Sequence, residues 1–323
     1  MTNDVFVYIE EEMGVAKKIG LEAITAAKAL VKDGSIIAVV IGCNVENVAK
    51  EAVDYGADKA VVVDGERFAV YSTEAYFEAF TQLCKKYKPS VVLAGTTQDA
   101  KDFIPRVAIK LETGCVSGVL DVEIADNENV IWTCSSYGGN VLSQVLCEGR
   151  PQIGIIHSSS FKKGEKIEKE AEIINETVPD VQLKARIKEA VKEISEIVNL
   201  EEAEVIVAGG RGMGSPEGFK LVWDFAQLLG GVVGATRAPI ESGWVSRAHQ
   251  IGQSGKTVAP KLYIACGISG ATQHVAGIMG SDYIVAINKD EDASIFDIAN
   301  VGIVGNAIEI IPDMMKEIKK ILM

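Results

Sequence analysis

Two patterns of apolar residues alternate along the first 110 residues of the chain. Short runs rich in Val and Ile are bounded by turn residues, and the segments between them space apolar residues three and four positions apart. The first pattern is typical of buried strands and the second of amphipathic helices. The predicted strands are 4–10, 35–42, 59–64 and 90–95, and the predicted helices are 15–32, 45–55, 73–87 and 100–111. Because the strands are apolar throughout, we expect a parallel sheet covered by helices on both faces.

The pattern changes after about residue 116. Four strand-like segments, 119–125, 130–137, 140–147 and 152–157, follow one another with only turns such as DNEN and YGGN between them. Strands joined by short turns pair antiparallel, because a parallel connection needs a longer crossover. We therefore expect these four segments to form an antiparallel extension of the first sheet.

A charge-rich region with little strongly apolar content, 162–200, divides the chain, and we expect a linker near 180–200. The α/β alternation then resumes. The predicted strands are 204–208, 231–235, 261–266, 282–287 and 301–304, and the predicted helices are 216–229, 270–279 and 312–322. A length of 323 residues fits two domains. We predict two doubly wound, Rossmann-like α/β domains, 1–195 with the antiparallel extension and 196–323 with a parallel sheet.

Composition narrows the functional class. A formal net charge of −13 disfavours a nucleic-acid partner, because phosphate backbones require clustered Lys and Arg. No apolar stretch approaches the roughly 20 residues of a membrane span, so we expect no membrane insertion. The first residues carry no targeting pattern, so we expect a cytoplasmic protein. The six cysteines form no C-x-x-C pair and lack a suitably spaced His, which favours reduced thiols over a metal site.

Two phosphate-binding motifs fail on spacing. The stretch AGGRGMGS (208–215) follows a predicted strand, but the third glycine of G-x-G-x-x-G falls one residue early, at Gly214. A glycine-rich turn without a ligand is the alternative there. QSGKT (253–257) resembles the end of a P-loop, but Gln250 stands where its first glycine is required. Neither an ordinary NAD fingerprint nor a P-loop is supported.

Several polar, glycine-containing loops follow the predicted strands between 235 and 306. Because such loops converge at the carboxyl ends of a parallel sheet, they favour a large ligand with phosphates, hydroxyls and a flat ring. Each candidate residue also has a structural interpretation. Arg237 suits a surface salt bridge, Ser254 and Asn288 suit turns, and His274 suits a core histidine with internal hydrogen bonds. Both interpretations stay open at this point.

The motifs GGRG, ATRAPIESGW, QIGQSGKTVAPKLYIACGISGATQHVAG and AINKD lie between Val205 and Ile310. This stretch resembles the FAD-binding C-terminal domain of the electron transfer flavoprotein alpha subunit. The segment RPQIGIIHSSSF (150–161) and the preceding YGGN resemble the first domain of that family more weakly. The two-domain length agrees with the resemblance.

The resemblance implies one FAD in the second domain, held by a set of residues that share its polar loops. The set is Arg211, Thr236, Arg237, Gln250, Ile251, Gly252, Gln253, Ser254, Gly267, Ser269, Gly270, Ala271, Thr272, Gln273, His274, Asn288 and Asn306.

By position, Arg211 and the 269–274 loop would contact the phosphate and ribityl regions, and Asn288 and Asn306 the adenosine half. Thr236, Arg237 and residues 250–254 would lie on the isoalloxazine side. The resemblance further implies a hydrogen bond or charge from His274 near the flavin C2 carbonyl. Arg237 stays charged and would favour the reduced ring, whereas His274 can titrate.

As a whole, the resemblance implies the alpha subunit of a heterodimeric electron transfer flavoprotein, an electron carrier rather than a stand-alone enzyme. Its first domain would pack on a beta subunit, and its redox partner would be an acyl-CoA dehydrogenase or related flavoenzyme. The charged, weakly apolar segment 162–200 suggests the further hypothesis that the second domain swings to meet that partner. A place in an NADH-dependent electron-bifurcating complex stays open. Two alternatives also stay open: a nicotinamide-binding Rossmann oxidoreductase or transhydrogenase-like domain, and a nucleotide-sensing module without redox function.

Overall fold

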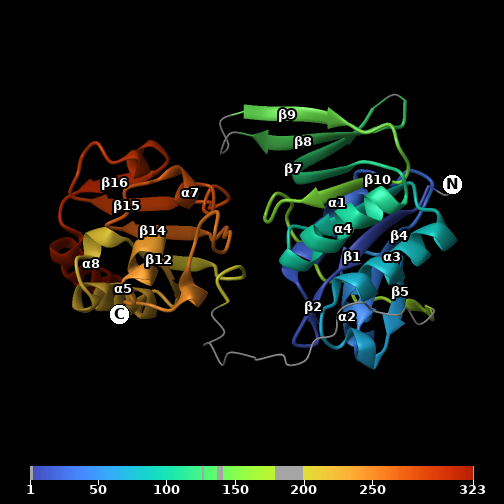
Figure 1. Ribbon diagram of the computed structural model, residues 1–323. Coiled ribbons are helices and arrows are strands. Elements are labelled where there is room, and N and C mark those ends of the chain that lie inside the picture. The colour runs from blue at the N-terminus through green and yellow to red at the C-terminus, as the bar shows by residue number, and fades with distance from the viewer. Residues whose placement is uncertain (1–2, 126, 137–140, 179–198, 323) are drawn as a thin grey trace. The chain divides into compact units, whose positions relative to one another are not determined.

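The computed structural model describes residues 3–125, 127–136, 141–178 and 199–322 and contains two compact units (Figure 1). The first unit comprises 1–191 and the second 192–323. The expected boundary at 195/196 and the expected linker at 180–200 fall almost entirely in 179–198, outside the described residues. Each unit is therefore described by itself.

The first unit is built on a nine-stranded sheet, in the order β11-β5-β4-β1-β6-β10-β7-β8-β9. Its strands are β1 Val5–Ile9, β4 Ile36–Gly42, β5 Lys59–Asp64, β6 Val91–Gly95, β7 Cys115–Ile124, β8 Val130–Ser136, β9 Val141–Leu146, β10 Gln152–Ile156 and β11 Glu172–Asn175. Its helices are α1 Lys18–Lys28, α2 Glu46–Asp54, α3 Thr73–Tyr87 and α4 Gln98–Lys110. A small hairpin, β2 Glu11–Glu12 and β3 Val15–Ala16, precedes α1, and a 3-10 turn, η1 Glu66–Phe68, precedes α3.

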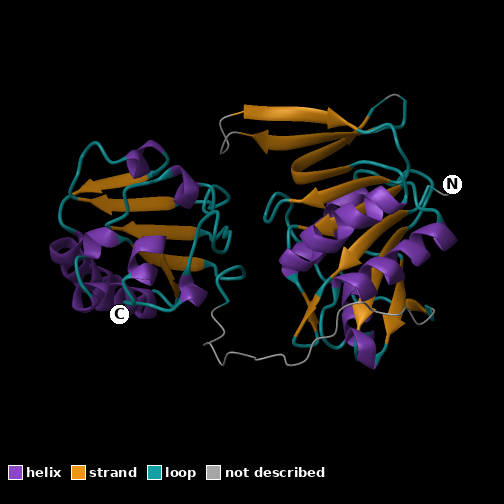
Figure 2. Cartoon of the chain, viewed as in Figure 1, coloured by secondary structure: helices purple, strands orange, loops and turns teal. Residues whose placement is uncertain are grey.

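Helices cover both faces of the parallel part of this sheet (Figure 2). Successive residues of β1 contribute to opposite cores: Val5 and Val7 pack with α1 and α2, and Phe6 and Tyr8 pack with α3 and α4. All four side chains are buried. The expected helix-covered parallel sheet is confirmed, because a strand buried on both faces must be apolar throughout.

The antiparallel extension is confirmed for β7, β8 and β9, which pair antiparallel in that order. The prediction was wrong for β10, which runs parallel to both β6 and β7 and lies between them. The short turn before β10 misled the prediction, because a short connection does not require its two strands to be neighbours. Strand β11 was not predicted. It lies within the charge-rich stretch 162–200 and pairs parallel with β5.

The second unit holds a five-stranded parallel sheet in the order β13-β12-β14-β15-β16. The strands are β12 Val205–Gly209, β13 Val232–Ala235, β14 Leu262–Cys266, β15 Ile284–Asn288 and β16 Val301–Val304. The helices are α5 Pro216–Leu228, α6 Arg237–Glu241, α7 Thr272–Val275 and α8 Ala307–Leu322, and the 3-10 turns are η3 Arg211–Met213, η4 Arg247–His249 and η5 Ser294–Asp297. From β12 the chain moves first to β13 on one side and then to β14 on the other, so the topological switch point lies between β12 and β14.

Three predicted helices have different limits in the structure. The predicted helix 15–32 begins only at Lys18, after β3. The predicted helix 270–279 is reduced to the single turn α7, because its glycines favour turns over a regular helix. The predicted helix 312–322 begins earlier, at Ala307, so Pro312 lies inside α8, where its missing N–H removes one intrahelical hydrogen bond. In the part of the chain that the structure describes, no helix has the length and apolar composition needed to cross a membrane.

Candidate functional site

The predicted cofactor residues lie at the carboxyl ends of the second sheet. All except Asn288, the last residue of β15, lie on loops or helix starts after β12, β13, β14 or β16. Within this set, the exposed polar and charged side chains are Arg211, Arg237, Gln253, Ser254, Ser269, Thr272 and Gln273. The structure thus brings to one edge of the sheet a group of residues that are separated by up to 95 positions in the chain. This edge is where ligands bind in open α/β sheets.

Glycines bring two of these loops into backbone contact at the switch point. The N–H of Gly210 donates to the carbonyl of Cys266, and the N–H of Gly212 donates to the carbonyl of Gly267, both at 2.9 Å. A Cβ on Gly210 would lie 2.3 Å from the Gly267 oxygen, which no side chain tolerates. The glycine spacing that failed as a dinucleotide fingerprint therefore serves this close approach of the β12 and β14 loops.

The loop after β14 leaves backbone donors available. Gly267 and Gly270 have φ values of 62° and 87°, and the Ser269 carbonyl accepts from the N–H of Ile295 at 3.0 Å. Within the described residues, the backbone N–H groups of 269–273 have no acceptor. A run of free N–H groups in a glycine-containing turn is suited to phosphate oxygens.

The loop before β14 is fixed against the loop after it. The N–H of Gln253 donates to the Gln273 carbonyl at 2.7 Å, and the Gln250 amide donates to the Ser254 hydroxyl at 2.9 Å. Gly252 has a φ of 134°, and a Cβ there would lie 2.8 Å from the Gln273 carbonyl oxygen. Residues 250–254 and 273 consequently form one surface.

The side chain of His274 points into the protein and has two internal partners. Its Nδ1 lies 3.1 Å from the Ile251 carbonyl, and its Nε2 lies 2.9 Å from the Tyr263 hydroxyl. Because a carbonyl only accepts, Nδ1 carries the proton and Nε2 accepts from the tyrosine. Burial lowers the pKa of His274 to about 4. The structural interpretation is thus observed for His274, which links β14 to the 250–254 loop as a neutral side chain, and its contact with a cofactor stays a prediction.

We expect this histidine to make the stability of the second unit depend on pH. Its pKa is about 4 in the folded protein against 6.5 for the free group, so its contribution is complete above pH 6.5 and is lost as the pH falls toward 4. Between pH 7.5 and 5 the loss is about 2 kcal/mol. Urea unfolding of wild type and of His274→Gln at both pH values measures it. Equal losses in the two proteins would assign the pH dependence to other groups.

Other predicted side chains also have partners within the unit. Arg237 forms a surface ion pair with Glu241, with Nε 2.6 Å from Oε1, and both side chains are more than half exposed. The Asn288 amide donates to the Ile268 carbonyl at 2.8 Å, and its Oδ1 accepts from the N–H of Asp290. The salt-bridge and turn interpretations are thus observed for Arg237 and Asn288. Contact of either residue with a cofactor stays a prediction.

Two further predicted residues lie at helix starts. Asn306 Oδ1 accepts from the N–H of Ile308 at 3.2 Å, and its amide donates to Glu309 at 2.9 Å, at the beginning of α8. Thr236 precedes α6, and its N–H donates to the Gly209 carbonyl at 3.1 Å. The Asn306 side chain and the Thr236 backbone are thus held next to the strand ends.

Sequence reasoning did not identify Tyr263 and Ile295, which support the site. Tyr263 is fully buried and fixes His274, and Ile295 closes the 3-10 turn η5 onto Ser269. The tyrosine had a detectable signal, because it stands at an inward position in the apolar run LYIAC. No local pattern connects Ile295 with Ser269, because the two residues are 26 positions apart and β15 lies between them in the chain.

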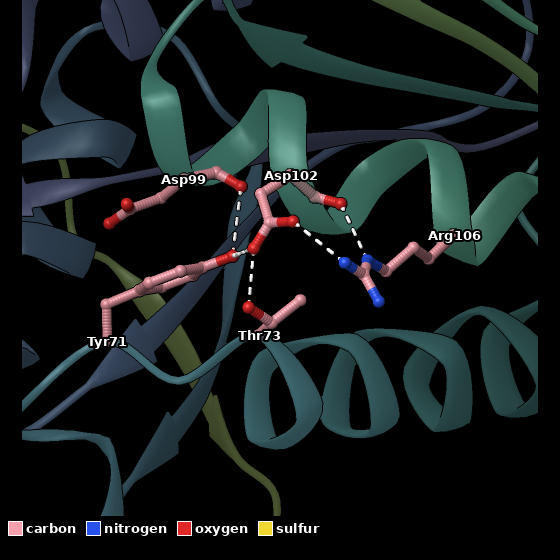
Figure 3. Close-up of polar contacts among 5 residues, drawn as sticks. All are labelled: Tyr71, Thr73, Asp99, Asp102 and Arg106. Atoms are coloured by element: carbon pink, nitrogen blue, oxygen red, sulfur yellow. Dashed lines mark hydrogen bonds and ion pairs between the residues drawn. The ribbon is translucent and has the colours of Figure 1, made fainter. Parts of the chain in front are cut away.

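The first unit holds a polar cluster that the sequence did not suggest (Figure 3). Asp102 on α4 accepts from the hydroxyls of Tyr71 and Thr73 and pairs with Arg106, with Nη2 3.1 Å from Oδ1. These hydrogen bonds, led by that of Thr73, lower the pKa of Asp102. Burial and the nearby Glu10 raise the pKa of Asp99 to about 6. Since both carboxylate oxygens of Asp102 have partners, the cluster joins the loop before α3 to α4.

Metal chemistry has no candidate site in the ranges that the structure describes. No group of three or more His, Cys, Asp or Glu side chains there is arranged to hold a metal ion. The six cysteines are free thiols, and burial raises the pKa of Cys266 to about 12.

Comparison with known proteins identifies both units. Residues 5–181 match the model of the electron transfer flavoprotein domain, and 199–279 match that of the electron transfer flavoprotein FAD-binding domain. The chain is 42% identical to the electron transfer flavoprotein subunit alpha of Thermoanaerobacterium thermosaccharolyticum, over 98% of each chain. It is 39% identical to subunit alpha of Megasphaera elsdenii, over 98% of this chain and 96% of that protein.

A relative with a different name is subunit LctC of the lactate dehydrogenase (NAD(+),ferredoxin) of Acetobacterium woodii. It is 35% identical over 97% of this chain and 76% of its own length. Both domain models and the full-length relatives agree with the resemblance stated from the sequence motifs. The chain belongs to the electron transfer flavoprotein alpha subunit family.

Proposed function

We propose that this chain binds one FAD at the carboxyl ends of β12 to β16 and transfers electrons as the alpha subunit of a heterodimer. The observation that carries the proposal is the 267–274 loop, whose free N–H groups lie at the switch point of a sheet matched by the FAD-binding model.

The residues of the site fit the chemistry of FAD. Free backbone donors in 269–273 and the exposed guanidinium of Arg211 suit the two phosphates. The exposed hydroxyls and amides of Ser254, Thr272 and Gln273 suit a polyol and the polar edge of a flat ring. The buried, neutral His274 orders the loop rather than adding charge to it.

When bound, the flavin supplies reversible uptake of electrons. The chain supplies the binding loops and a positive charge at Arg237. The proposed electron donor is an acyl-CoA dehydrogenase or a related flavoenzyme, and the proposed partner is a beta subunit that packs on the first unit. Free thiols throughout support our proposal of a cytoplasmic location.

The name of the Acetobacterium woodii relative includes both NAD(+) and ferredoxin. On that ground we extend the proposal to an NADH-dependent, electron-bifurcating complex. Assays of the purified complex with NADH test this extension. Oxidation of NADH that requires a low-potential acceptor and a second acceptor together supports it, and oxidation with either acceptor alone contradicts it.

Absorbance spectroscopy of the heterodimer, followed by chromatography of the released cofactor, tests the main proposal. We expect the bands of oxidised flavin and one FAD per alpha chain. A nicotinamide-binding oxidoreductase would release a nicotinamide nucleotide, and a nucleotide-sensing module would release a nucleotide without a visible chromophore. Either of these results, or a colourless and empty heterodimer, would reject the proposal.

A further inference from the structure

Strand β9 forms an outer edge of the sheet in the first unit (Figure 1). It pairs with β8 along its full length, and no described strand pairs with its other side. Its sequence, VLSQVL, contains no charged residue and no proline. Proteins usually protect a free edge with Lys, Pro or a bulge, because an uncharged edge readily accepts another strand.

One face of this edge is apolar and exposed. Leu142 and Leu146 are 65% and 57% exposed, whereas Val145 on the opposite face packs against the core. Leu146 lies opposite Ile131 of β8, and Leu142 lies opposite Ser135. The outer face of β8 and β9 thus presents aliphatic and small polar side chains to solvent.

The first charged side chains, counted inward from the edge strand β9, lie on β7, the third strand. Asp121 and Glu123 of β7 are exposed and lie opposite Thr133 and Ile131 of β8. In a chain with 24% charged residues, β8 and β9 carry none. An apolar centre with a charged border is typical of a protein interface.

We propose that β9 and its outer face form part of the interface with the beta subunit, and that a strand of that subunit pairs along the free edge of β9. This inference rests on the proposed function, which supplies the beta subunit. Permanent subunit interfaces are more apolar than the small, weak contacts of redox encounters. The uncharged edge therefore suits a permanent subunit better than the dehydrogenase.

The expected docking follows the rules of strand addition. Backbone hydrogen bonds along β9 supply part of the affinity, and pockets for alternate side chains supply specificity. Leu142 and Leu146 lie on the same face, four residues apart. Each would pack against an apolar side chain of the added strand. The partner surface opposite them must consequently be apolar and uncharged.

The double variant Leu142→Glu/Leu146→Glu tests this interface. Both side chains are mainly exposed, so the free chain should fold normally, as circular dichroism will show. We expect affinity for the immobilised beta subunit, measured by interferometry, to fall at least tenfold, because two charges would be buried without partners. We expect Ile109→Glu, at a 78% exposed aliphatic residue on α4, to change the affinity less than twofold. Hydrogen exchange in residues 141–146 should also slow at least tenfold when the beta subunit binds.

One result would overturn this inference and leave the proposed function intact. In that result the wild-type chain binds the beta subunit and flavin, and the double variant binds the beta subunit with the same affinity. A wild-type dimer of this chain that the double variant abolishes, with unchanged affinity for the beta subunit, would also overturn it in favour of a second copy. Failure of the wild-type chain to bind the beta subunit would reject the proposed function, and this inference with it.

Discussion

Replacing Gly270 by alanine is expected to abolish retention of FAD during purification. Gly270 has a φ of 87°, and a Cβ there would lie 2.2 Å from the backbone nitrogen of Ile295. That nitrogen donates to the Ser269 carbonyl, so the loop cannot accept the methyl group without separating from η5. We expect a destabilisation of about 1–3 kcal/mol and at least a tenfold loss of cofactor affinity. The ratio of flavin absorbance to protein in the purified heterodimer measures the loss.

The matched control is Gly230→Ala. Gly230 also has a positive φ, 64°, but nothing lies within 4 Å of the position of its Cβ. In this variant the added methyl group meets no other atom, so it tests backbone strain alone, which costs about 1–2 kcal/mol. Equal flavin content in the two variants would show that the 267–274 loop does not hold the cofactor.

The sequence was sufficient to predict the regular parts of both sheets. All nine parallel strands predicted outside the extension were confirmed, because each is an apolar run bounded by turn residues. The pattern could not show where a strand lies in the sheet. Strand β10 follows β9 after a short turn, yet it lies between β6 and β7, where its two apolar faces are both buried. Its sequence, QIGII, has isoleucines on both faces and no charge, which was the available signal for a central parallel strand.

Strand β11 shows the reverse case. Its four residues, EIIN, carry too little apolar content to be recognised within a charged segment. Long-range contacts hold it in place: it pairs with β5, and Glu176 beyond it pairs with Lys86 on α3. Part of the charge-rich region 162–200 therefore belongs to the sheet of the first unit. Such contacts join residues about 90–110 positions apart, which periodicity within a window cannot detect.

The candidate site was predictable as a set of loops but not as a set of side-chain roles. The family resemblance, combined with the positions of the predicted strand ends, gave a set of residues. The structure places this set at the carboxyl ends of the second sheet. The role of His274 depended on Tyr263, eleven positions away on β14, whose hydroxyl lies 2.9 Å from Nε2, and on burial, which lowers the pKa of the imidazole. Burial thus decides the protonation state, and burial is a property of the fold rather than of the motif.

Removing the guanidinium of Arg237 is expected to lower the reduction potential of the bound flavin, because a positive charge favours an added electron. Glu241 lies 2.6 Å from the same guanidinium and opposes its effect, so Glu241→Gln is expected to raise the potential. Both side chains are more than half exposed, and solvent limits the interaction to that of surface charges. We expect shifts of roughly 10–40 mV in opposite directions.

Spectroelectrochemical titration of the heterodimer measures both shifts at low ionic strength, where screening is weakest. Lys220→Ala, which removes an exposed cation from α5, is the control and should leave the potential within a few millivolts of wild type. Opposite signs for the two variants would require the ion pair to lie near the flavin, since a purely structural effect would move both potentials alike. Unchanged potentials in both variants would instead place the isoalloxazine ring away from α6.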